Sequence, residues 1–430
     1  MIPEHDVEVA TGGRAIGALA APASKSVTNR LLVLAALADG VSVLRAPLES
    51  DDSAVMRRLV EALGARVVDA GGDWHVHGTG GRLRDPGMPL DAGLSGTTMR
   101  FGLALATLAP SPATVTGLAP LLARPVAPLV GALSTLGADI ADEQGYPPIS
   151  VGGGGLRGGS VTVDVSRSSQ FASALLLVAP YAASDVEVTI SGEAATDYIA
   201  LTIEMMRDWG AVVTETGHGR WRVDAGTRYV ARDLTVEYDA SAAAHLLGLA
   251  AATGGEVTVT NATAGSRQPD AALPQVLAQM GCEVHRDGDA LTLRGPQRLE
   301  RIAVDLAAMP DQVTTVAALA ALCEGTSEIH GVGVARTHET DRLAALATEL
   351  GKLGVEVEES PDALWITGGA ARGPARLHTY DDHRLAMSFA AVSARVAGVA
   401  IAEPWCVTKT YPRFWADVAL LGLDWREVTD

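Results

Sequence analysis

Runs of almost continuous apolar residues recur along the chain, and each follows a short polar cluster. Two examples are LLVLAALA at 31–38 and VAALAALC at 316–323. A helix on a protein surface has a polar face, whereas a helix that is apolar all round is buried. The pattern therefore predicts buried helices whose only polar part is the N-terminal turn.

These polar clusters return about every seventy residues. They read ASKSVTNR (23–30), SGTTMR (95–100), SSQFAS (168–173), DASAAAH (239–245), PDQVTT (310–315) and DDHRLA (381–386). A recurrence at a fixed interval indicates an internal structural repeat. The sequence therefore contains six copies of one unit.

A second series of glycines runs in phase with the clusters. Each glycine follows an apolar residue at the end of a helix-like segment, and a strand-like run comes next: Gly64, Gly137, Gly210, Gly281, Gly354 and Gly422. A glycine at this place suits a left-handed cap at the end of a helix. In the sixth copy the run that follows, LDWREV, is shortened by the end of the sequence.

Together the two series predict an α/β protein with the order strand-helix-strand-helix-strand-strand in each repeat. Six repeats in 430 residues indicate two domains of three repeats, with a break near residue 237. A solenoid is the alternative for repeats of this length. The fully buried helix in every copy argues against it, because a solenoid helix shows one face to solvent.

The composition excludes some classes of function. The formal net charge of −18 argues against a general nucleic-acid-binding protein, whose surface is basic. Three cysteines, far apart and in no metal-ligand spacing, are typical of a reducing compartment. The first residues lack the pattern of a secretory signal, and the most apolar stretch, 171–183, is too short to cross a bilayer. We therefore expect a cytoplasmic protein without membrane spans, nucleic-acid partners or bound metal.

The polar helix starts point instead to anionic small molecules. A helix N-terminus carries unpaired N–H groups and about half a positive charge, so it binds anions. The helix starts of this chain carry the groups Lys25, Arg30, Arg100, Ser168, Ser169, His383 and Arg384. Serine and aspartate at these places can also be plain helix caps. Capping does not explain the Lys, Arg and His side chains, which favour an anion site.

The same motifs resemble those of the EPSP synthases, a family of enolpyruvyl transferases, in order and over nearly the whole chain. The matching segments are ASKSVTNRLLVLAAL (23–37), SGTTMR (95–100), LLARPVAPLVGAL (121–133), SSQFASALLL (168–177), MPDQVTT (309–315), HETDRLAALATEL (338–350), YDDHRLAMSFA (380–390) and TKTYPRFW (408–415). The resemblance implies two inside-out α/β barrel domains, with helix N-termini facing the cleft between them. One domain would comprise 20–237 and the other 1–19 plus 238–430.

The resemblance also implies an activity and its residues. The enolpyruvyl group of phosphoenolpyruvate would pass to the 5-hydroxyl of shikimate 3-phosphate, with Asp311 as base, Glu339 as acid and Lys25 contacting both substrates. The residues expected to bind shikimate 3-phosphate are Lys25, Ser26, Arg30, Ser168, Ser169, Gln170, Tyr198, Asp311 and His338. Those expected to bind phosphoenolpyruvate are Lys25, Gly96, Arg124, Gln170, Arg342, His383, Arg384 and Lys409. The chemistry needs no cofactor, and we expect a monomer.

Some positions depart from the family pattern. Leu94, Phe101 and His338 replace the usual Asn, Pro and Lys, and Ala195 stands where a third phosphate-binding serine is expected. These departures keep open a relative that acts on another cyclic polyol phosphate. A sister enzyme acting on a UDP-amino sugar would carry a cysteine before the Arg-Pro pair, and this chain has none before Cys282. A protein that only binds anions would not need both an acid and a base.

Overall fold

The computed structural model describes residues 2–192 and 196–428. The chain divides into two compact units of similar size. One consists of Ala23–Val236 and is called the central unit here; the other combines Met1–Pro22 with Glu237–Asp430 and is called the terminal unit. Among the described residues, no helix is both long enough and apolar enough to cross a membrane.

The central unit contains three copies of the repeat. Its elements are α1 (Lys25–Leu37), β3 (Val41–Arg45), α2 (Asp51–Ala62), β4 (Arg66–Ala70), β5 (Asp73–His77), β6 (Leu90–Asp91), α3 (Gly96–Ala106), β7 (Ala113–Thr116), α4 (Ala119–Leu122), α5 (Ala127–Thr135), β8 (Ile140–Glu143), β9 (Tyr146–Val151), β10 (Gly159–Asp164), α6 (Gln170–Val178), η1 (Ala179–Tyr181), β11 (Val186–Ser191), α7 (Asp197–Asp208), β12 (Val213–Gly217), β13 (Arg220–Val223) and β14 (Asp233–Thr235).

The terminal unit contains the other three copies. Its elements are β1 (Asp6–Val9), β2 (Ile16–Leu19), α8 (Ala240–Thr253), β15 (Glu256–Val259), η2 (Pro269–Ala272), α9 (Leu273–Gln279), β16 (Glu283–Asp287), β17 (Ala290–Arg294), β18 (Ala303–Asp305), η3 (Pro310–Gln312), α10 (Val313–Ala320), β19 (Gly325–His330), η4 (Gly333–Thr337), α11 (Arg342–Gly351), β20 (Glu356–Glu359), β21 (Ala363–Gly368), β22 (Ala375–Leu377), α12 (His383–Ser393), β23 (Val399–Ile401), η5 (Pro404–Lys409), α13 (Phe414–Leu420) and β24 (Trp425–Val428).

Each repeat forms one four-stranded sheet. In β6-β7-β9-β8, β10-β11-β13-β12 and β18-β19-β21-β20, the first two strands are parallel and the others antiparallel. The strand order predicted for the repeat is thus found, and the protein is a mixed α/β protein. Within the described ranges every sheet stays four-stranded, and none closes into a barrel.

Three strands pair with repeats that are remote in the sequence. The strand β14 joins β3 in the central unit, while β2 joins β15 in the terminal unit, both in parallel. The strand β1 lies between β23 and β24 and is antiparallel to both. The sixth repeat thus lacks one strand of its own, as the sequence suggested, and β1 supplies the missing strand of its sheet.

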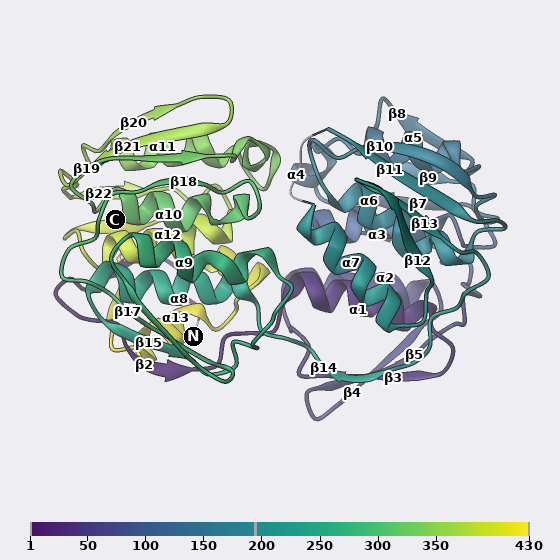
Figure 1. The fold of residues 1–430 in the computed structure, drawn as a ribbon, viewed down its shortest axis with the longest axis horizontal. Helices are drawn as coiled ribbons and strands as arrows, with labels where there is room; N and C mark the ends of the chain where they lie inside the picture. The colour runs from purple at the N-terminus through teal and green to yellow at the C-terminus, as the bar shows by residue number, and fades with distance from the viewer. Residues whose placement is uncertain (1, 193–195, 429–430) are drawn as a thin grey trace. The chain divides into compact units, whose positions relative to one another are not determined.

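The helices that follow the polar clusters are buried, as the sequence predicted. All residues of α8 from Ala240 to Thr253 are buried, and α1 is buried from Val27 to Leu37. In the terminal unit α8, α10 and α12 pack against one another, and in the central unit α3 packs against both α1 and α6 (Figure 1). The six glycines at the predicted helix ends all have positive φ, between +79° and +112°.

Candidate active site

Arg342 lies at the centre of a group of ion pairs in the terminal unit. It is the first residue of α11, and only 1% of its side chain is exposed. Its Nε donates to Asp382 Oδ2 at 2.7 Å, and its Nη2 donates to Asp382 Oδ1 at 3.2 Å. Asp382 is fully buried and also caps α12 by accepting from the backbone N–H of Arg384. This paired contact fixes the plane of the guanidinium group.

The same guanidinium group holds both predicted catalytic carboxylates. Its Nη1 donates to Asp311 Oδ1 at 2.6 Å, and its Nη2 donates to Glu339 Oε2 at 3.0 Å. Each carboxylate has a second cation on its other oxygen: Arg384 Nη2 lies 3.0 Å from Asp311 Oδ2, and Lys409 Nζ lies 3.0 Å from Glu339 Oε1. We call Asp311, Glu339, Arg342, Asp382, Arg384 and Lys409 the ion-pair cluster.

His338 and His383 border the ion-pair cluster. His338 Nδ1 lies 3.0 Å from both Arg342 Nη1 and Asp311 Oδ1. A protonated Nδ1 donates to the carboxylate, and an unprotonated Nδ1 accepts from the guanidinium, so its proton selects one of the two contacts. His383 begins α12 and is buried, with Nδ1 3.9 Å from Asp382 Oδ1.

The cluster changes the acidity of its members. Burial alone would raise the pKa of Asp311, but Arg384, and after it His338 and Arg342, hold that pKa well below its usual value. Burial would lower the pKa of Arg342, and the carboxylates of Asp382, Asp311 and Glu339 raise it instead. The resting cluster is therefore fully ionised at these two residues.

Acid should remove the contribution of Asp311 to stability. A carboxyl group whose pKa is lower in the folded state stabilises the fold above its unfolded pKa, about 3.9, and this stabilisation is lost as pH falls further. We expect Asp311→Asn to lower the free energy of unfolding at pH 7 and to lower it less at pH 3. Urea denaturation of both proteins at the two pH values measures this. Equal losses at both values would contradict the ion pairing described for Asp311.

In the central unit, Arg30 is buried near the start of α1. Its Nε donates to Thr202 Oγ1 at 2.7 Å, and its Nη1 donates to the Ser26 carbonyl at 2.9 Å. The rings of Phe101 and Tyr198 each lie 5.6 Å from its guanidinium carbon. Burial lowers the pKa of Arg30 to about 10, so the group remains a cation at neutral pH. No carboxylate is among these contacts, which leaves its charge for an anionic ligand.

Two further guanidinium groups meet at the start of α3. A Cβ atom on Gly96 would stand 2.7 Å from Arg100 Nη1 and 3.5 Å from Arg124 Nη1. Arg100 Nη1 also donates to Gln170 Oε1 at 3.0 Å, which brings the first residue of α6 to the same place. The structure thus brings together Gly96, Arg124 and Gln170, three of the residues predicted to bind phosphoenolpyruvate. A Cβ at Gly96 would displace the end of the Arg100 side chain.

The remaining predicted residues of the central unit lie at helix starts. Lys25 begins α1, with Nζ 3.3 Å from Asp52 Oδ2. Ser169 precedes α6, and Ser168 Oγ accepts from the backbone N–H of Gln170 at 3.3 Å. Tyr198 lies in the first turn of α7. The departure from the family pattern noted at Ala195 falls outside the described residues.

Two supporting residues, Asp382 and Thr202, were not assigned a role from the sequence, and Arg100 was noted only as one cation at a helix start. Asp382 holds Arg342, Thr202 holds Arg30, and Arg100 holds Gln170. Asp382 had a visible signal, since it stands before His383 as a helix cap, but nothing in the sequence linked it to a residue 40 positions away. Thr202 lies 172 positions from Arg30 in a helix of mixed composition and had no signal.

The fold and the site together define a class of protein. A solved structure of the enolpyruvyl transferase NikO from Streptomyces tendae has the same fold, with a TM-score of 0.77 at 18% identity, and the match covers 100% of both chains. The EPSP synthase of Acinetobacter baumannii aligns with a TM-score of 0.84 at 25% identity, over 99% of this chain and 100% of that one. The architecture is thus that of the enolpyruvyl transferases.

The family model of EPSP synthase (3-phosphoshikimate 1-carboxyvinyltransferase) matches residues 9–418. The 3-phosphoshikimate 1-carboxyvinyltransferase of Methanoculleus marisnigri is 40% identical over 413 residues, which is 95% of this chain and 97% of the relative. That of Syntrophobacter fumaroxidans is 41% identical over 401 residues, 92% of this chain and 95% of the relative. The chain belongs to the EPSP synthase family.

Proposed function

We propose that this protein is a 3-phosphoshikimate 1-carboxyvinyltransferase, which transfers the enolpyruvyl group of phosphoenolpyruvate to the 5-hydroxyl of shikimate 3-phosphate. The observation that carries the proposal is the ion-pair cluster, in which Arg342 holds two partly exposed carboxylates, Asp311 and Glu339, beside two further cations. An acid and a base beside dense positive charge suit addition and elimination on a phosphorylated enol. Relatives of the same name match the chain at about 40% identity.

The cations are assigned to the two anionic substrates. Phosphoenolpyruvate would bind to Lys25, Gly96, Arg124, Gln170, Arg342, His383, Arg384 and Lys409. Shikimate 3-phosphate would bind to Lys25, Ser26, Arg30, Ser168, Ser169, Gln170, Tyr198, Asp311 and His338. The planar guanidinium groups suit carboxylate and phosphate oxygens, and the ammonium groups supply compact charge. Arg30 supports the assignment, because its contacts leave its charge without a carboxylate.

The reaction needs two proton transfers in its first step. Glu339 gives a proton to the methylene carbon of phosphoenolpyruvate, while Asp311 takes the proton of the attacking hydroxyl. The hydroxyl oxygen then bonds to the carbon that bears the phosphate, which forms a tetrahedral intermediate. In the second step the bond from that carbon to the phosphate oxygen breaks, and phosphate leaves with its electron pair. The methyl group returns a proton to the carboxylate of Glu339, which restores the double bond.

Substrate binding would prepare both carboxylates for these steps. A phosphate bound to Lys409 and Arg342 takes donors that Glu339 holds in the resting structure, so the carboxyl group can carry the proton it must deliver. Anions on Arg384 and Arg342 weaken the effect of these cations on Asp311, and its lowered pKa rises toward that of a working base. The resting ion pairs thus exchange for substrate contacts.

The finer expectations about architecture are part of the same proposal. We infer that the three sheets of each unit wrap around its buried helices as an inside-out barrel, with the acid and base in the terminal unit and the shikimate phosphate residues in the central unit. We also propose a monomer in the cytoplasm, without nucleic-acid partners. The packing of α8, α10 and α12 within the terminal unit supports the first point.

The proposal is tested by measuring phosphate release from phosphoenolpyruvate. We expect release with shikimate 3-phosphate and none with shikimate, because the acceptor phosphate supplies much of the binding energy. A second assay offers other cyclic polyol phosphates. If phosphate release were faster with one of these compounds, that compound would be the acceptor in place of shikimate 3-phosphate, and the transfer reaction would still hold. Absence of release with every acceptor would refute the transferase assignment.

A further inference from the structure

A cavity of about 370 Å³ lies in the central unit at the C-terminal ends of its buried helices. The proposed substrate residues Gly96 and Gln170 begin α3 and α6, whereas the cavity is lined by Leu108 and Pro180, which follow the ends of the same helices. The cavity is therefore distinct from the proposed active site. Its volume is within the range of sites that hold small organic ligands.

The charged lining of this cavity is entirely cationic, in a chain of net charge −18. The two charged residues that line it are Arg82 and Arg228, both exposed. Arg228 Nη1 donates to the carbonyl of Gly80. Within the described part of the chain, the guanidinium group of Arg82 has no hydrogen-bond or ion-pair partner. The acid Asp39 lies near the adjoining loop, with Oδ1 3.9 Å from the place of a Cβ on Gly80, and it is not among the residues that line the cavity.

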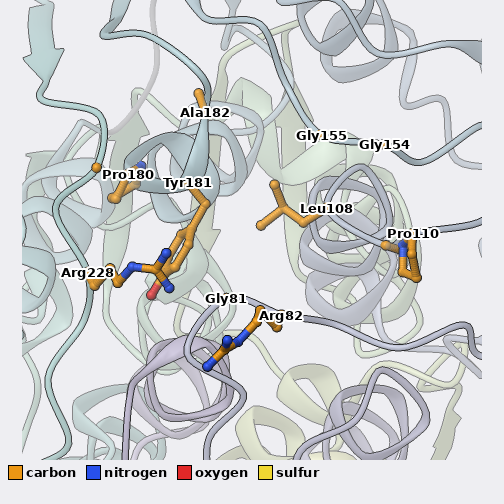
Figure 2. A pocket seen from close by; sticks show the side chains of 12 residues that line it. Gly81, Arg82, Leu108, Pro110, Gly154, Gly155, Pro180, Tyr181, Ala182 and Arg228 are labelled. Carbon is orange, nitrogen blue, oxygen red and sulfur yellow. The ribbon is translucent and has the colours of Figure 1, made fainter.

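The rest of the wall is apolar and held in place. The hydroxyl of Tyr181 donates to the Leu37 carbonyl at 2.6 Å, and burial raises its pKa to about 12, so this residue adds no negative charge. The ring packs so closely on Gly81 that a Cβ there would stand 2.3 Å from it. Figure 2 shows Tyr181 beside Arg228 on one side of the cavity and Leu108 with Pro110 on the other.

We propose that this cavity binds a small organic anion, namely a carboxylate carried by a compact apolar ring. The planar fork of Arg82 matches the two carboxylate oxygens, and Arg228 adds positive charge. The ring of the ligand would lie between Tyr181 and Leu108. This apolar contact is needed because an exposed ion pair contributes little binding energy by itself. This inference does not depend on the proposed transferase activity, because none of these residues belongs to the substrate sets.

Benzoate is the probe for this site, measured by isothermal titration calorimetry. We expect benzoate to bind the unmodified protein, and benzyl alcohol and acetate to bind at least about tenfold more weakly, because each lacks one half of the recognised ligand. Arg82→Gln should raise the benzoate Kd about tenfold, as expected for loss of a hydrogen bond to a charged group. Arg58→Gln, at an exposed position of α2, is the matched control and should leave the Kd unchanged.

A further variant separates this cavity from the substrate cations. If Arg124→Gln abolishes benzoate binding and Arg82→Gln leaves it intact, the anion occupies the proposed phosphoenolpyruvate residues and the inference is wrong. Failure of benzoate to bind the unmodified protein also overturns it. Acetate binding as tightly as benzoate would refute the role of the apolar wall.

Discussion

Replacing Glu339 by Gln is expected to lower kcat by about 10²–10⁴-fold, the usual contribution of a general acid or base. The amide keeps the size of the side chain and can still accept from Lys409 or Arg342, which contact the two carboxylate oxygens at 3.0 Å. It has no carboxyl proton to give to the methylene carbon. Steady-state kinetics, with the Kd of shikimate 3-phosphate from calorimetry, should show a large loss of turnover and little change in affinity.

Glu359→Gln is the control for this prediction. Glu359 also pairs with an arginine, since its Oε2 lies 2.7 Å from Arg336 Nη2, but it is a third exposed and lies outside the ion-pair cluster. We expect it to keep near-native turnover. If Glu339→Gln also turned over at a near-native rate, Glu339 would not be the acid. A loss confined to substrate affinity would make it a binding residue only.

Replacing Asp382 by Ala should destabilise the protein by about 3–5 kcal/mol, because it removes one partner of a buried ion pair. The ion-pair cluster would then hold three cations, Arg342, Arg384 and Lys409, against the two carboxylates of Asp311 and Glu339. Asp382 is fully buried, and its two oxygens accept from Arg342 at 2.7 and 3.2 Å. The substitution also removes the cap of α12, which holds Arg384 in place. The first loss affects Arg342 and the second affects Arg384. Both arginines contact Asp311, so activity should fall together with stability. Chemical denaturation monitored by circular dichroism gives the free energy.

Asp341→Ala separates the buried charge from the helix cap. Asp341 caps α11 by accepting from Ala344 at 3.1 Å, and it pairs with Arg336 at 2.9 Å, but 41% of its side chain is exposed. Loss of a cap costs about 1 kcal/mol, and an exposed pair adds little. We therefore expect a clearly smaller loss than in Asp382→Ala. Equal losses would mean that Asp382 acts only as a cap.

Local patterns in the sequence were enough to predict the repeat. The polar clusters are the starts of buried helices, and Gly64 and its five counterparts have positive φ at helix ends. Both features could be predicted because each depends only on residues that are neighbours in the sequence. The positions of the strands β2 and β14 could not be read in the same way. The residues of a strand determine its alternation and burial, but they do not determine which remote strand it pairs with. Here β14 pairs with β3 in the central unit, and β2 pairs with β15 in the terminal unit.

In the candidate site, too, local features could be predicted from the sequence and remote contacts could not. Its charged residues stood out because Lys, Arg and His are unusual in apolar helices, and their chemistry is visible in single residues. Their partners did not stand out. Asp382 and Arg342 form their pair across 40 positions, and Ser173, which lies 3.0 Å from the hydroxyl of Thr202, contacts Arg30 across 143 positions. Such contacts depend on helix packing, which a single sequence does not specify.

The pairing of β1 with β24 sets an order of events during synthesis on the ribosome. The strand β1 is made before the whole central unit, yet its partners at 399–401 and 425–428 are made after it. All residues of the central unit leave the ribosome before the terminal unit has its second repeat, so the central unit can fold while β1 is still unpaired. The terminal unit has a long loop to close, which slows folding. The free β1 is an unpaired strand edge in that interval, and its alternating charges, Asp6 and Glu8, would discourage pairing with other chains.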